Sequence, residues 1–145
     1  MQFSLPWIQV ANGACDALVH CMECYFHGTN QEMTLAYLEA VQKTLIKTAD
    51  LIQASREDYD ARANFCYATT LALNGMQGVG IAGDWATHFL EHALSVLLPD
   101  CAHGSGLAII LPAWILEIGV KHNPATIKRW AREIWNCDSV EAAVE

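Results

Sequence analysis

Apolar residues recur every three or four positions along most of the chain, which is the spacing of amphipathic α-helices. The pattern is clearest over residues 31–54, where we expect one stripe of side chains to face a core: Leu35, Leu38, Val41 or Gln42, Leu45 and Ile52. The sequence contains no alternating strand pattern of useful length and no internal repeat. It therefore predicts an all-α fold, a compact bundle of about six helices.

Capping and helix-breaking residues divide this pattern into separate elements. We expect an extended lead-in over residues 1–11, with Asn12 as the N-cap of the first helix. Asp58 is expected to cap a third helix, and Gly75 to follow its end. Pro112 should kink or split the very apolar fifth segment. The expected helices span residues 13–27, 31–54, 59–74, 84–98, 104–120 and 124–136, with a short one begun by Asp138 or Ser139.

The composition narrows the class of protein. At 145 residues, the chain is long enough for one domain with a core, and 53% of its residues are apolar. Such a composition suggests a surface meant to face another domain or subunit. The net charge of -8, with only eight basic residues, argues against nucleic-acid binding. No uninterrupted apolar run reaches about 18 residues, and the first residues lack the features of a signal peptide. We therefore expect a cytoplasmic protein that does not bind membranes, with its six cysteines as reduced, buried thiols.

Two short segments contain residues suited to binding a metal. The segment DWATHFLEHALSVLLPDCAHGSG holds three of the six histidines. His88 and His92 are four residues apart, so they project from one face of a helix, and His103 follows after a short break. Asp16 and His20 have the same helical spacing in an earlier segment. The two segments together predict a mixed site for one divalent cation of the Zn²⁺ or Fe²⁺ class.

Other interpretations of these motifs have less support. The segment from His88 to His92 fits the HxxEH pattern of inverted zinc proteases, in which Glu91 would be the general base. Those enzymes need a further carboxylate ligand and much more chain. A di-metal carboxylate bundle needs ExxH pairs, which the sequence lacks. The HGSG turn before a helix could hold a phosphate, but no GxGxxG or GxxxxGK[ST] motif accompanies it.

Three segments carry a resemblance to a known family: PWIQVANGACDALVHCMECYF, YDARANFCYATTLALNG and GDWATHFLEHALSVLLPDCAHGSGLAIILPAW. They resemble the C-terminal helical domain of the iron-containing (group III) alcohol dehydrogenases, within the dehydroquinate synthase-like fold. The branch they resemble most is that of the butanol dehydrogenases and NADPH-preferring aldehyde reductases. The resemblance runs from about residue 5 to residue 136.

The resemblance implies a role for each residue that matches the family motif. Asp16, His20, His88 and His103 match the four metal-ligand positions. His92 matches a position near the nicotinamide and the substrate, which the family uses in catalysis rather than ligation. In this family the metal, Fe²⁺ or often Zn²⁺, polarises the oxygen of an alcohol or aldehyde while a hydride passes to or from NAD(P).

The resemblance also implies a domain organisation. Family members are more than twice this long and begin with an α/β nucleotide-binding domain, which this sequence lacks. Residues 1–11 are then a remnant of the interdomain linker, and residues 12–145 are a truncated helical metal-binding domain. The function implied is that of a domain from an NAD(P)-dependent enzyme acting on a small alcohol or aldehyde. The alternative is a non-catalytic helical domain with an empty or structural metal site, whose exposed apolar face forms a homo-oligomer.

Overall fold

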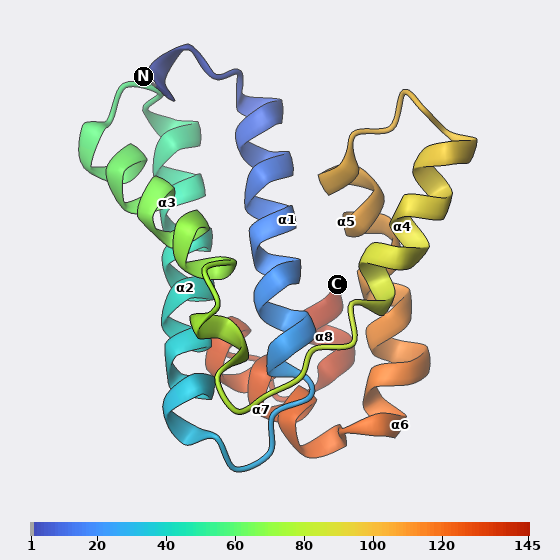
Figure 1. Ribbon diagram of the computed structural model, residues 1–145. Helices are drawn as coiled ribbons and strands as arrows, with labels where there is room; N and C mark the ends of the chain where they lie inside the picture. Colours follow the sequence, from blue (N-terminus) through green and yellow to red (C-terminus); the bar gives the residue numbers. More distant parts are fainter. Residues whose placement is uncertain (1) are drawn as a thin grey trace.

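The computed structural model describes residues 2–145, and every regular element in that range is helical. The all-α prediction is therefore confirmed. The elements are η1 (Gln2–Ser4), α1 (Trp7–Tyr25), α2 (Glu32–Ala54), α3 (Tyr59–Ala72), η2 (Met76–Gly78), α4 (Ala86–Leu97), α5 (His103–Trp114), η3 (Ile115–Gly119), α6 (Val120–His122), α7 (Pro124–Trp135) and α8 (Val140–Val144). Figure 1 shows α1 between the pair α2 and α3 and the pair α4 and α5, with α7 and α8 below.

The first helix begins earlier than the sequence pattern indicated. Pro6 occupies the N-cap position with φ −60° and ψ 152°, and α1 starts at the next residue, so the extended lead-in expected up to residue 11 is wrong from Trp7 onward. Proline is tolerated at a helix start, where its missing N–H would have no intrahelical partner. Val10 is fully buried, which fixes these first turns against the core. The interpretation of residues 1–11 as a linker stays a prediction.

The core prediction for α2 and the N-cap prediction for α3 are confirmed, whereas α3 ends at Ala72 with Leu73 as its C-cap, so the expected end at Gly75 is wrong. Every residue of the expected apolar stripe on α2 is buried. Asp58 caps α3 by accepting a hydrogen bond of 2.9 Å from the backbone N–H of Ala61. The helix α4 begins two residues later than expected, because Trp85 adopts a left-handed backbone with φ 58°. The Oδ1 atom of Asp84 instead accepts a hydrogen bond from the N–H of Ala86 at 3.0 Å.

Residues His103–His122 form one continuous helix made of α5, η3 and α6. Pro112 does not split it; a π-helical turn follows from Ile115 to Gly119, where the hydrogen-bond register adjusts. By length and composition alone, with a mean hydropathy of 1.4, this helix would be able to cross a membrane. The same properties are common in core helices, and α5 packs against both α1 and α4.

The outer face of α4 exposes apolar side chains. Phe89, Val96 and Leu97 are 69%, 81% and 76% exposed, although the opposite face of the helix packs on α5. This surface is of the kind that the composition led us to expect. Among the cysteines, Cys21 and Cys24 are buried, whereas Cys66 is exposed, so the expectation of uniformly buried thiols is only partly met.

Candidate metal centre

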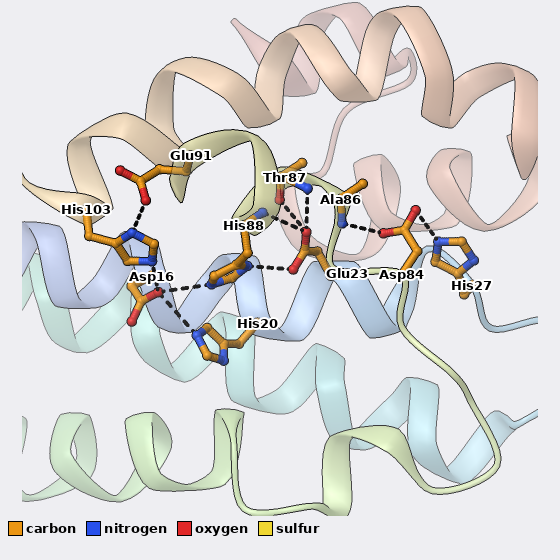
Figure 2. Close-up of polar contacts among 10 residues, drawn as sticks. All are labelled: Asp16, His20, Glu23, His27, Asp84, Ala86, Thr87, His88, Glu91 and His103. Atoms are coloured by element: carbon orange, nitrogen blue, oxygen red, sulfur yellow. Dashed lines mark hydrogen bonds and ion pairs between the residues drawn. The ribbon is translucent and has the colours of Figure 1, made fainter. Parts of the chain in front are cut away.

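The four predicted ligands meet where α1, α4 and the start of α5 come together (Figure 2). The carboxylate of Asp16 lies at the centre of the group. Its Oδ1 atom is 3.2 Å from Nε2 of His20, 3.3 Å from Nε2 of His88 and 3.4 Å from Nε2 of His103. Three segments far apart in the sequence thus direct the same nitrogen of three imidazoles toward one carboxylate oxygen.

These distances suit a shared cation. Donors that each lie about 2.0–2.1 Å from a tetrahedral metal are about 3.3 Å from one another. The ligand atoms of Asp16, His88 and His103 all lie within 4.8 Å of one another, while His20 stands outside this group and joins it through Asp16. Imidazole nitrogens with one carboxylate oxygen fit Zn²⁺ or Fe²⁺. The residues present therefore fit the metal that the sequence predicts.

Glu23 holds the ring of His88 in the orientation that a metal ligand needs. It is buried on α1, and its Oε2 atom is 2.6 Å from Nδ1 of His88. Its Oε1 atom accepts hydrogen bonds from the N–H of Thr87 at 2.8 Å and from the Thr87 hydroxyl at 2.5 Å. Because Nδ1 donates to Glu23, the Nε2 atom of His88 is free to face the other ligands.

Glu91 plays the same part for His103. It is fully buried on α4, and one of its oxygens contacts Nδ1 of His103. Its other oxygen accepts a hydrogen bond of 2.6 Å from the hydroxyl of Ser95. Gly106 packs so closely that an added Cβ would lie 2.7 Å from Oε1 of Glu91. Both oxygens of Glu91 are occupied, by His103 and Ser95, which argues against a protease-type general base at this position.

The electrostatics of the site follow from these contacts. Burial raises the pKa of Asp16, but hydrogen bonds from His20 and His88 outweigh it and hold that pKa below its usual range. Burial lowers the pKa of His88, yet its hydrogen bonds to Asp16 and Glu23 raise the pKa to about 9. His20 differs from the other two rings, because its Nδ1 atom is buried without a hydrogen-bond partner.

His92 lies beside the four ligands rather than among them. It is exposed on α4, and its ring centre is 5.5 Å from that of His103 and 6.4 Å from that of His88. Ligand atoms of Glu91, His92 and His103 lie within 4.8 Å of one another, so His92 adjoins His103 but is not in the group formed by Asp16, His88 and His103. Its catalytic role stays a prediction.

The glycine-rich turn serves close packing. An added Cβ on Gly104 would lie 2.2 Å from the backbone oxygen of Asn12, so only glycine lets α5 approach α1 this closely. The hydroxyl of Ser105 donates to the side chain of Asn12 at 2.7 Å. Asn12 lies inside α1 and helps to seat α5, rather than capping a helix as we expected.

The sequence did not predict that Glu23 and Glu91 would orient metal ligands. Glu23 lies seven residues after Asp16 and three after His20, so it shares their face of α1, and this spacing could have identified it. No comparable signal was available for Glu91, because its partner lies on the next helix.

Comparisons with known proteins agree with the geometry. Residues 10–145 match the sequence model described as "Fe-containing alcohol dehydrogenase family, C-terminal". The chain is 36% identical over 137 residues to the probable NADH-dependent butanol dehydrogenase 1 of Bacillus subtilis, which covers 94% of this chain and 35% of that protein. It is 38% identical over 136 residues to the NADPH-dependent aldehyde reductase YqhD of Escherichia coli, which covers 92% of this chain and 34% of that protein.

A solved structure is similar over nearly the whole chain. The crystal structure of NADH-dependent butanol dehydrogenase A from Thermotoga maritima superposes with a TM-score of 0.93 at 38% sequence identity. The superposition covers 99% of this chain and 37% of the dehydrogenase. The chain therefore spans about a third of the length of the relatives it matches.

Proposed function

Because this chain belongs to the iron-containing alcohol dehydrogenase family, we propose that it is the metal-binding domain of an enzyme that interconverts a primary alcohol and an aldehyde. The relatives named for butanol dehydrogenase and aldehyde reductase activity support this substrate class. The observation that carries the proposal is the convergence of three Nε2 atoms within 3.4 Å of one oxygen of Asp16.

The exposure of the ligands gives the site an open side. The side chains of Asp16 and His103 are 37% and 38% exposed, whereas those of His20 and His88 are only 14% and 10% exposed. A small alcohol or aldehyde would therefore approach past Asp16 and His103. A divalent ion bound here, Fe²⁺ or Zn²⁺, would supply Lewis-acid polarisation of the substrate oxygen.

The side chains around the ligands would orient the rings and handle protons. Glu23 and Glu91 keep the Nδ1 atoms of His88 and His103 occupied, which leaves the Nε2 atoms for coordination. His92 is exposed on the α4 turn that follows His88, where it could donate a proton to the substrate or accept one from it.

The nicotinamide cofactor, NAD or NADP, would be held by the part of the family's length that this chain does not span. We therefore expect the 145-residue chain alone to show negligible NAD(P)H turnover with alcohols or aldehydes. Robust turnover by the purified chain would contradict this expectation.

The experiment that tests the proposal is metal analysis of single alanine variants. His88→Ala and His103→Ala should each lower the metal content by one ion per chain, because each removes a donor from a four-ligand site. His92→Ala is the matched control, since it removes an exposed histidine on the same helix and should leave the metal content unchanged. Equal metal content in all three variants would rule out the site.

A second candidate function is favoured by the apolar face of α4, where Phe89, Val96 and Leu97 are exposed. It is a non-catalytic helical domain with an empty or structural metal site, which forms a homo-oligomer through that face. Two results together would favour this candidate: the wild-type chain binds no metal, and the Val96→Asp variant no longer self-associates. Metal binding that depends on His88 and His103 favours the dehydrogenase domain.

A further inference from the structure

We propose that a pocket beside Arg62 binds a small monocarboxylate with a flat apolar body, such as an arenecarboxylate. The pocket lies at the start of α3, against the N-terminal turn η1, and its volume is about 260 Å³. Six residues line this Arg62 pocket: Gln2, Phe3, Tyr59, Arg62, Ala63 and Cys66. None of them belongs to the candidate metal centre, so the inference goes beyond the proposed function and does not depend on it.

Arg62 is a buried cation without a counter-ion. The residue is only 4% exposed. Its Nε atom donates a hydrogen bond of 3.0 Å to the backbone oxygen of Arg56, but its Nη1 atom is buried and has no hydrogen-bond partner among residues 2–145. The ion pairs that lysine and arginine form within these residues do not include Arg62. Since a buried charge is costly unless it is paired, an anion in the pocket would supply the missing partner.

The acidic residues closest to Arg62 on α3 are directed elsewhere. Asp58 and Asp60 line a different cavity, between α2 and α3, together with Lys43 and Lys47. Asp58 also accepts a hydrogen bond of 2.9 Å from the N–H of Ala61 as the cap of the helix. Neither carboxylate therefore neutralises the guanidinium of Arg62 from within its own helix.

The walls of the Arg62 pocket are largely aromatic. The rings of Phe3 and Tyr59 are 38% and 72% exposed, which leaves apolar surface available to a ligand. Arg56 holds this part of η1 in place, because its guanidinium donates to the backbone oxygens of Phe3 and Ser4 at 2.8 and 3.0 Å. Figure 1 shows the N-terminal turn beside the start of α3. Apolar walls around one charged group are typical of a small-ligand site.

The chemistry of the pocket favours a carboxylate. A planar guanidinium matches the planar carboxylate group, and it can donate through two nitrogens at once. Because Nε of Arg62 already donates to Arg56, the ligand would meet the Nη atoms. The volume lies below the usual range of about 300–1,000 Å³ for ligand pockets, so the ligand is small. One aromatic ring with one carboxylate satisfies both requirements.

The test is a titration of the metal-free 145-residue chain with benzoate, followed by heteronuclear NMR of the backbone amides. A chelator keeps the chain free of metal, so benzoate cannot report on the candidate metal centre. Wild type should show saturable shift changes in η1 and the first turns of α3. Benzamide has the same shape without the charge and should bind at least about tenfold more weakly. Acetate keeps the charge without the ring and should also bind more weakly.

Variants of the lining residues locate the binding. Ala63→Phe fills the pocket from an exposed position and should abolish binding. Tyr59→Ala should weaken it by about 2–10-fold through the loss of an aromatic contact. Tyr67→Ala is the matched control, because Tyr67 is a 65% exposed aromatic residue on the same helix that does not line the pocket, and it should bind as wild type does.

Arg62→Gln removes the charge and should weaken benzoate binding at least about tenfold. Circular dichroism would show whether this variant folds; if it does not, Ala63→Phe and Tyr59→Ala decide the question, since both positions are exposed. The proposal is overturned if wild type shows no saturable binding of benzoate, or if benzamide binds equally well. Wild-type benzoate affinity in Ala63→Phe would overturn it too. His88→Ala should bind benzoate as wild type does, so failure of the metal centre would leave this result unchanged.

Discussion

Replacement of Glu23 by glutamine tests how much the buried carboxylate contributes to metal binding. Glu23 receives contacts from four groups on two oxygens, the N–H and hydroxyl of Thr87 and the N–H and Nδ1 of His88. Glutamine keeps one oxygen and puts an NH₂ group in place of the other. If the NH₂ faces His88, the ring must accept at Nδ1, and its proton moves to the Nε2 atom that the metal needs.

If the NH₂ instead faces Thr87, two donors oppose each other and a buried N–H loses its acceptor. Either arrangement should weaken metal binding by about 10–100-fold, the usual effect of losing such an outer partner. This range corresponds to about 1.4–2.8 kcal/mol. The free energy of unfolding of the metal-free chain should fall by about 1–3 kcal/mol, the cost of an unsatisfied buried donor.

Zinc affinity is measured by competition with a chromophoric chelator, with zinc kept below one equivalent. The free energy of unfolding of the metal-free chain is measured by urea unfolding in the presence of a strong chelator. Glu57→Gln is the control, because Glu57 is exposed and far along the chain from the site ligands, and it should change neither quantity. Wild-type zinc affinity in Glu23→Gln would refute the argument that the Glu23 carboxylate sets the orientation of His88.

Two further predictions concern the packing that positions the site. Gly104→Ala should destabilise the chain by about 1–3 kcal/mol, because its Cβ would lie 2.2 Å from a backbone atom of Asn12. Gly13→Ala is the control and should be neutral or stabilising, because a Cβ there has nothing within 4 Å. Equal losses of stability for both variants in thermal unfolding would contradict this prediction. Arg129→Ala should cost about 2–3 kcal/mol in urea unfolding, because it leaves the buried carboxylate of Glu39 without its 2.8 Å partner. Arg132→Ala, whose ion pair is exposed, should cost less than about 0.5 kcal/mol, and a similar loss in both arginine variants would be the contrary result.

The sequence predicted the helices well wherever local signals decide them. The apolar stripe of α2 and the cap at Asp58 depend on residues close together in the chain, and both are confirmed. The start of α1 was predicted too late, at Gly13 after an Asn12 cap, whereas Pro6 is the N-cap and the burial of Val10 fixes the first turns against the core. The burial of Val10 is a tertiary effect, which local patterns do not record.

The ligand set was accessible from the sequence for a similar reason. The spacing of four residues between Asp16 and His20 fixes their common face, and the order of motifs along the chain resembled a known family. The role of Glu91 was not accessible in this way, whereas the spacing of Glu23 from Asp16 and His20 could have identified it. Glu91 is held by a ring on another helix, and its role depends on how α4 and α5 pack.

The central claim is most directly tested by a crystal structure of the chain grown with Zn²⁺, with anomalous data collected on both sides of the zinc absorption edge. We expect an anomalous peak about 2.0–2.2 Å from Oδ1 of Asp16 and from the Nε2 atoms of the three surrounding histidines: His20, His88 and His103. A well-ordered Asp16 with no peak beside it at saturating zinc would contradict the account.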